Sequence, residues 1–162
     1  MMLAQFTEPN LLLPHMVSEG REAAIIELSG RLENAGRVED ANAFALAVLK
    51  HDSQVSAVFD AVAFPLARVS VVKELSFAFG LSQRGMLWGT GKAPIVHAVI
   101  LFAVPISAGQ DHLSLVVTFS KLLNDKMTFS ALQRCAQPAE MFIALQQVHI
   151  LQTGSRSEAT HH

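Results

Sequence analysis

The sequence predicts one α/β domain built on a mixed β-sheet of about five strands, with helices packed on both faces of the sheet. A chain of 162 residues has the length of one compact domain. Apolar residues make up 51% of the chain and charged residues 16%, which leaves ample material for a buried core. The stretch 95–104 is apolar at successive positions, and this pattern is typical of a strand covered on both sides.

The first fifty residues predict a short strand followed by two helices. The apolar run 11–13 forms the predicted strand and stops at Pro14. Ser18 is a good N-cap for the first helix, and Gly36 is a natural residue to end it. Asp40 can cap the second helix, whose buried stripe is expected at Ala41, Phe44, Ala45 and Val48.

The middle of the chain changes to short segments rich in β-forming residues. Strands are expected at 62–66 and at 76–81, and the second segment alternates phenylalanines with small residues. Glycines at positions 85, 89 and 91 indicate a loop around Trp88. The central strand 95–104 follows this loop.

The last third of the chain is predicted to be helical. A helix over 111–124 would turn one stripe of side chains inward, namely His112, Leu115, Val116, Phe119, Leu122 and Leu123. Two further amphipathic segments lie near 128–135 and 138–150, and Pro138 suits a first helical position. The polar tail 153–162 is expected to be disordered, so the predicted domain covers residues 1–152.

Composition excludes several classes of function. The net charge of −2 gives no electrostatic argument for binding nucleic acid or an anionic membrane. The N-terminus lacks the pattern of a signal peptide, and the longest apolar run falls short of the ~20 residues of a membrane helix. The single cysteine, Cys135, permits no intrachain disulfide and suits a reducing compartment. We expect a cytoplasmic protein with no membrane insertion and no cofactor. We also expect no metal site, because the histidines are scattered along the sequence and Cys135 stands alone.

One segment suggests a family. Val62-Ala63-Phe64-Pro65-Leu66 resembles the phosphohistidine strand of enzyme IIA domains of the bacterial phosphotransferase system, of the fructose, mannitol and nitrogen-regulatory (PtsN-like) type. That strand reads roughly Gly-Ile-Ala-Ile-Pro-His, and its histidine accepts the phosphoryl group. The resemblance extends from about Leu11 to Gln147 and implies the family's fold. Further along the chain, five segments resemble the family in their order and spacing: Trp88-Gly89, Pro94 to His97, Phe102 to Pro105, His112-Leu113 and Leu122-Leu123.

The departures from the family concentrate at its phosphorylation site. Leu66 stands where the family has its phosphohistidine, and a leucine side chain has no lone pair that could carry phosphate. The family's glycine-rich approach loop corresponds here to residues 55–61, which contain no glycine. Lys50 matches a family arginine and supplies positive charge without a bidentate fork. His112 matches the second histidine of the family, which helps to hold the phosphoryl group.

Structural interpretations compete with a functional one for several of these residues. His112 could be a histidine at the edge of the core, hydrogen-bonded to a backbone carbonyl. His97 is expected to be a satisfied core histidine, and His51 with Asp52 a solvated polar pair at a helix end. Phenylalanines 59 and 64 and Leu66 fit the core, although an exposed cluster of them would mark a protein contact surface.

The sequence leads to three hypotheses. The first is a phosphorylation-incompetent, IIA-like regulatory module that binds proteins, with an HPr-type phosphocarrier or a regulated transporter or kinase as partner. The second is residual phosphoryl transfer through another histidine such as His112. The third is a sensor that binds an anion or metabolite through the remaining phosphate site of Lys50 and His112. The sequence leaves a homo-oligomer open.

Overall fold

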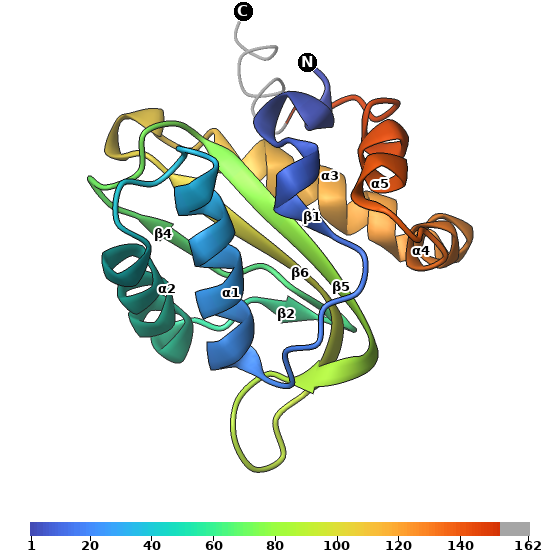
Figure 1. The fold of residues 1–162 in the computed structure, drawn as a ribbon, viewed down its shortest axis with the longest axis horizontal. Helices are drawn as coiled ribbons and strands as arrows, with labels where there is room; N and C mark the ends of the chain where they lie inside the picture. Colours follow the sequence, from blue (N-terminus) through green and yellow to red (C-terminus); the bar gives the residue numbers. More distant parts are fainter. Residues whose placement is uncertain (153–162) are drawn as a thin grey trace, which may run out of the picture.

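A mixed sheet of six strands lies at the centre of the computed structural model, which describes residues 1–152 (Figure 1). The strands are β1 (Leu12–Leu13), β2 (Val58–Phe59), β3 (Val62–Ala63), β4 (Leu66–Arg68), β5 (Ser76–Leu87) and β6 (Ile95–Val104). Their order is β1-β5-β6-β3-β2, and β4 pairs with β6 further along that strand than β3 does. The predicted fold class is confirmed. The sheet has six strands where about five were expected, since residues 58–59 form an edge strand and the expected strand 62–66 is divided in two.

Helices cover both faces of this sheet, as predicted. They are α1 (Arg21–Asn34), α2 (Ala41–Gln54), α3 (His112–Asn124), α4 (Lys126–Gln133) and α5 (Pro138–Leu145), with short 3₁₀ turns η1 (Leu3–Phe6), η2 (Pro9–Leu11) and η3 (Ile106–Ala108). Helices α1 and α2 pack on one face, and α3, α4 and α5 enclose a second apolar cluster on the other (Figure 1). The expected tail, 153–162, lies outside the described residues.

The antiparallel pair of β5 and β6 explains why the central segment is apolar on both of its faces, with His97 as its one polar residue. Side chains alternate between the two faces of a strand. Phe77, Phe79 and Phe102 therefore join the cluster under α3, whereas Ala78 and Leu101 join the cluster under α1 and α2. Both faces are dry, so both sets must be apolar.

Several element boundaries differ from those predicted. Helix α1 begins at Arg21 with Gly20 as N-cap, and Ser18 instead donates a hydrogen bond to the carboxylate of Glu27 at 2.7 Å. The expected strand 62–66 is broken into β3 and β4 around Phe64-Pro65. Pro65 has no N–H to donate to a ladder, but its carbonyl still accepts from the Phe102 N–H at 2.9 Å. Helix α5 is shorter than the segment 138–150.

The two ends of the described chain lie side by side. The N–H of Leu3 donates to the carbonyl of Val148 at 2.8 Å, and the N–H of Ile150 donates to the carbonyl of Met1 at 2.9 Å. Leu3 is fully buried in the cluster under α3. The N-terminal turn is therefore part of the packed domain.

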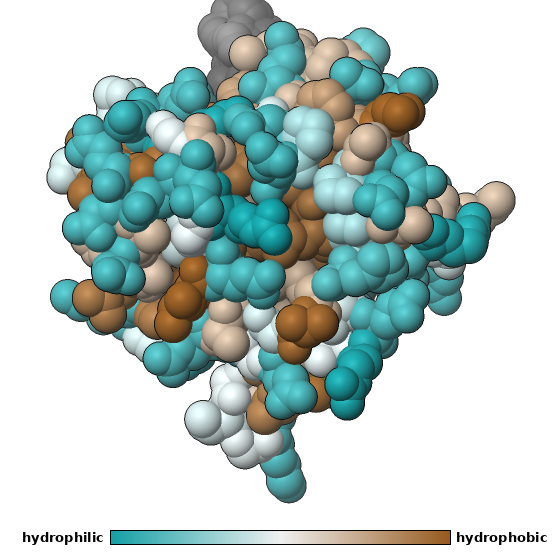
Figure 2. Space-filling view, viewed as in Figure 1, coloured by the Kyte–Doolittle hydropathy of each residue, from teal (hydrophilic) through white to brown (hydrophobic). Residues whose placement is uncertain are grey.

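The surface over α1 and α2 shows hydrophobic side chains as separate spots among hydrophilic ones (Figure 2). Such scattered apolar exposure is normal for a folded domain. Among the described residues, no helix combines the length and the apolar character needed to cross a membrane.

Candidate functional site

Leu66 opens strand β4 and lies opposite Phe102 of β6. Its side chain is half-buried and packs against the apolar cluster that also contains Leu115 of α3. Strands β4 and β6 are parallel, so their carboxyl ends meet at one edge of the sheet. In α/β folds this is the edge at which ligands usually bind.

His112 is the first residue of α3, one residue after the expected start at Asp111, and it lies in the opening turn as expected. The helix begins at the same edge of the sheet, next to the turn that Arg68 of β4 contacts. The residue is 7% exposed, and its Nδ1 atom has no hydrogen-bond partner in the described part of the chain. Burial lowers the pKa of His112, so its ring is neutral near pH 7.

Two further basic side chains, which the sequence analysis did not assign to this site, act on His112. Besides burial, electrostatic interaction with Arg68 and with His51 lowers its pKa, whereas the carboxylate of Asp111 raises it. Arg68 also donates a hydrogen bond to the carbonyl of Gly109, in the turn that precedes α3. Arg68 follows Leu66 by two positions in β4 and shares its face, so strand periodicity is the signal that could have found it.

Lys50, the predicted basic residue of this site, lies exposed near the end of α2. The charges acting on His112 come from Arg68, Asp111 and the next residue of α2, His51. The structure thus brings three places together: the end of α2, strand β4 and the start of α3. Leu66 and His112, two of the residues expected at this site, lie on strand β4 and at the start of α3.

The approach loop without glycine forms a hairpin of β2 and β3. Phe59 pairs with Val62, which leaves Asp60 and Ala61 as the turn. Asp60 has φ of 54°, a left-handed conformation that aspartate tolerates better than most residues. Phe59 is 60% exposed while Phe64 is 2% exposed, and their ring centroids lie 6.0 Å apart. Of the three residues proposed as a partner surface, Phe59 is the most exposed, Leu66 is half-buried and Phe64 belongs to the core.

Two other polar residues differ in their surroundings. His97 is half-buried and its Nδ1 lies 2.9 Å from the carbonyl of Ser82, which fits a satisfied structural histidine. Asp52 is not a solvated partner of His51, because it is 3% exposed and lies 3.5 Å from the guanidinium of Arg21. Burial raises the pKa of Asp52, and Arg21 partly offsets that effect.

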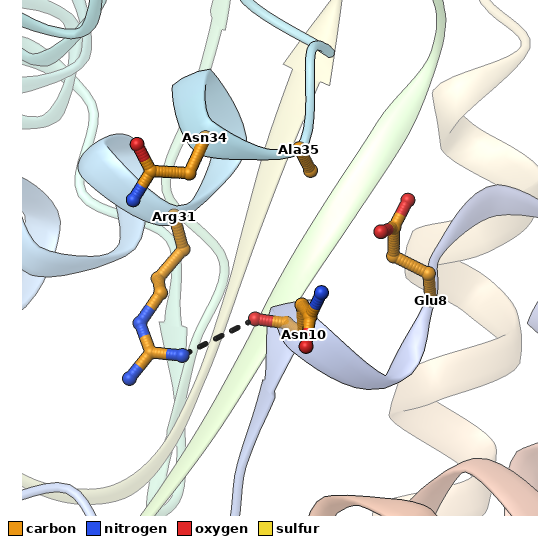
Figure 3. A pocket seen from close by; sticks show the side chains of 5 residues that line it. All are labelled: Glu8, Asn10, Arg31, Asn34 and Ala35. Atoms are coloured by element: carbon orange, nitrogen blue, oxygen red, sulfur yellow. Dashed lines mark hydrogen bonds between the residues drawn. The ribbon is translucent and has the colours of Figure 1, made fainter.

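A polar hollow of about 380 Å³ lies elsewhere, between η2 and the end of α1 (Figure 3). It is lined by Glu8, Asn10, Arg31, Asn34 and Ala35, and Arg31 reaches the carbonyl of Asn10. None of its residues belongs to the group around His112, by which we mean His112 itself with His51, Leu66, Arg68 and Asp111. The described residues also contain no cluster of His, Cys, Asp and Glu that could hold a metal ion.

The fold and this edge of the sheet define an α/β domain that places a buried histidine beside an arginine at the start of a helix. The positive charge of the arginine can attract an anion to this edge of the sheet. The side chain of Leu66, at the same edge, is a hydrocarbon and cannot act as a nucleophile. The chain belongs to the family described as "Phosphoenolpyruvate-dependent sugar phosphotransferase system, EIIA 2", whose model matches residues 5–148.

Individual relatives agree with this assignment. The chain is 28% identical over 148 residues to the "PTS system 2-O-alpha-mannosyl-D-glycerate-specific EIIABC component" of Escherichia coli K12, covering 90% of this chain and 22% of that protein. It spans about a fifth of the length of the curated relatives it matches.

Solved structures share the fold at low sequence identity. The nitrogen regulatory protein IIA-Ntr of Neisseria meningitidis superposes with a TM-score of 0.77 at 16% identity, covering 88% of this chain and 98% of that one. The enzyme IIA of E. coli mannitol transport, in its complex with phosphorylated enzyme IIB, gives a TM-score of 0.68 at 18% identity, covering 83% and 94% of the chains.

Proposed function

We propose that this chain is an enzyme IIA-like domain that cannot accept a phosphoryl group and acts as a regulatory, protein-binding module of the cytoplasm. The observation that carries the proposal is Leu66 on β4, at the position where the resemblance of the sequence to the family implies the phosphohistidine. A hydrocarbon side chain offers no lone pair to attack phosphorus, so no phosphoenzyme can form at this residue. The domain would remain permanently in the form that its relatives adopt before phosphorylation.

The surroundings of Leu66 support a change of role rather than an isolated loss. The glycine-rich approach loop of the family is replaced by the hairpin of β2 and β3, with an exposed aromatic ring at Phe59. Arg68 and His112 nevertheless keep positive and polar groups at the same edge of the sheet. The remodelled loop presents apolar surface, which suits contact with another protein.

The proposed partners are an HPr-type phosphocarrier or a regulated transporter or kinase of a bacterial, PtsN-like nitrogen-regulatory branch. The structural neighbour from mannitol transport was solved with a phosphorylated enzyme IIB, so that protein binds a phosphorylated partner. Arg68, near His112, would attract such a phosphoryl group without accepting it. Calorimetric titration of the chain with phosphorylated and unphosphorylated HPr-type carrier measures this preference.

Phosphorylation itself tests the proposal. The chain is incubated with enzyme I, an HPr-type carrier and radiolabelled phosphoenolpyruvate, and we expect no acid-labile phosphate on it. Stoichiometric labelling of the unaltered chain would overturn the proposal. Leu66→His tests whether the scaffold still supports transfer, with Leu66→Gln as a control that adds polarity without an imidazole. Labelling of the histidine variant alone would place the loss of activity at this one side chain.

Residual transfer through His112 is a second candidate function. It is favoured by the unpartnered Nδ1 atom and by the lowered pKa, which keeps the ring unprotonated and nucleophilic near pH 7. This candidate predicts that labelling occurs in the unaltered chain, disappears in His112→Ala and persists in His97→Ala. In the family the corresponding histidine orients the phosphoryl group and does not carry it, so we place this candidate second.

An anion sensor is the third candidate. His112 and the predicted Lys50 would then bind a phosphorylated metabolite. Arg68, which interacts electrostatically with His112, would add a further positive charge to this binding site. Ligands that bind the folded state raise the melting temperature. No rise in Tm with any of a panel of phosphorylated metabolites would argue against this candidate.

A further inference from the structure

A groove of about 870 Å³ runs between the β2–β3 hairpin and helices α3 and α4. One wall is formed by Phe59, Val62 and Phe64 of the hairpin segment, and the other includes Val116 and Val117 of α3 and Phe129 of α4. No residue of the group around His112 lines it. The groove is therefore a feature separate from the site at Leu66, although Phe64 lies two positions before that residue.

The groove exposes large apolar side chains to solvent. Phe59 is 60% exposed and Val117 is 42% exposed, although both could gain hydrophobic free energy by burial. A hollow with a mostly apolar lining and exposed aromatic or branched side chains marks a binding surface. Phe59 lies on the edge strand of the sheet, where no further strand covers it.

The helical wall of the groove carries positive charge. Lys121 of α3 and Lys126 at the start of α4 both line it, and neither forms an ion pair with any of the residues 1–152. Asp60, in the hairpin turn, is the one acidic side chain of the lining. The lining therefore has a net positive charge and complements an acidic partner.

The dimensions of the groove favour a helix as its occupant. The α3 wall extends from Val116 to Asn124, which corresponds to about 12 Å or two helical turns. Strand β2 has only two residues, so an added strand would find few main-chain partners there. We propose that this groove binds an amphipathic helix of a partner protein, with an apolar stripe at i, i+3 or i+4 and i+7 and acidic residues beside it.

Two other occupants fit the groove poorly. Residues 153–162 of the chain itself contain no large apolar side chain that could fill it. A second copy that presented the same groove would set hollow against hollow and leave a void that neither fills. The proposal rests on the binding role argued above and makes no use of Leu66 or His112.

The test selects helical peptides that bind to the whole chain. A display library of 14-residue helical peptides with a fixed apolar stripe and randomised flanking positions is panned on the protein, and fluorescence anisotropy measures the binding of enriched peptides. We expect enrichment of Asp and Glu at the flanks. Val117→Asp should weaken binding at least about tenfold, because it places a charge in the groove. Leu46→Asp is the matched control, since each residue is the sixth of its helix and exposed, and Leu46 lies on α2.

A charge exchange completes the test. The double variant Lys121→Glu and Lys126→Glu should lose affinity for the acidic peptide and recover it when the acidic residues of the peptide are replaced by lysine. Failure to enrich acidic flanks, failure to obtain any binder, or equal binding by the Val117→Asp and Leu46→Asp variants would overturn the groove proposal. Phosphate labelling of the chain would overturn the proposed function instead, so the two failures are distinguishable.

Discussion

At the scale of single residues, the site is governed by charges that the chain places near a buried imidazole. His112 is buried, and electrostatic interaction with Arg68 and with His51 further disfavours its protonated form. Asp111 opposes them from the adjacent position. The ring therefore remains available as a neutral hydrogen-bonding group at the edge of the sheet where β4 ends and α3 begins.

Replacing Arg68 by Gln should raise the pKa of His112, because a positive charge that destabilises the imidazolium is removed. Imidazole nitrogen shifts followed by NMR across pH 4–8 measure this change. Arg84→Gln is the control, since Arg84 is an exposed arginine on β5 that does not act on His112. An unchanged pKa in the Arg68 variant would mean that the two side chains do not interact.

Asp52 provides a prediction with a defined sign. Its pKa is raised above 3.8 by burial, so the folded chain binds this proton more tightly than the unfolded chain does. Stability from this group is present below pH 3.8 and is lost as pH rises through the raised pKa. Asp52→Asn removes that loss, so the free energy of unfolding of the variant minus that of the wild type should increase with pH over this window.

Urea unfolding of both chains from pH 3.5 to pH 7 measures the difference. The other titrating groups cancel in the comparison as long as the mutation leaves them in place. A difference that stays constant with pH would contradict a buried carboxyl. Arg21 lies 3.5 Å from Asp52, and Arg21→Gln should raise the pKa of Asp52 further, because the nearby positive charge would be lost.

At the scale of elements, close contacts rather than propensities decide several positions. Gly80 lies within β5, where the chain from β1 to α1 crosses closely. A Cβ at this position would lie 2.0 Å from Sδ of the buried Met16, whose N–H is fixed by the carbonyl of Leu81 at 2.8 Å. The strand therefore requires glycine at a position where β propensity alone disfavours it.

Gly80→Ala should destabilise the chain by about 1–3 kcal/mol through overpacking. Met16→Ala in the same chain should recover part of that loss by removing the clashing atoms. Gly30→Ala is the control, because Gly30 is in α1 with nothing within 4 Å of the added Cβ, and it should stabilise by about 0.5–1 kcal/mol. Equal effects of the two glycine substitutions in chemical denaturation would contradict the contact with Met16.

At the scale of the whole molecule, the two apolar clusters share the β5–β6 pair and should unfold together. Trp88, the single tryptophan, is buried in the cluster under α1 and α2. Phe119 lies in the cluster on the opposite face, with its ring 4.9 Å from that of Phe77 and 5.2 Å from that of Phe79. A change at Phe119 should therefore be detected at Trp88 across the sheet.

Phe119→Ala should cost about 3–5 kcal/mol and lower the melting temperature by roughly 6–20 °C, because it opens a cavity among aromatic rings. Trp88 fluorescence and far-UV circular dichroism should report the same midpoint in the wild type and in the variant. Met127→Ala, at an 82% exposed position, should change stability by less than about 0.5 kcal/mol. Separate midpoints for the two signals would show that the faces unfold independently.

The local features of the chain were largely predictable. The position of α3, with His112 in its first turn, follows from helical periodicity, and the apolar run of β6 follows from burial on both faces. The break at Phe64-Pro65 and the start of α1 at Arg21 were not predicted, because they depend on which neighbouring strand or loop takes up each backbone group. Edge strand β2 was missed because its two residues pair only within the folded hairpin.

The sequence by itself determined the fold class, the family resemblance and the absence of a nucleophile at Leu66, since the chemistry of a side chain does not depend on its neighbours. The tertiary structure decided which charges surround His112 and that Asp52 is buried. It also placed beside the hairpin an apolar groove with two lysines that form no ion pair within residues 1–152. Each of these depends on contacts between segments far apart in the chain. Strand register and helix packing set those contacts, and local sequence patterns do not encode them.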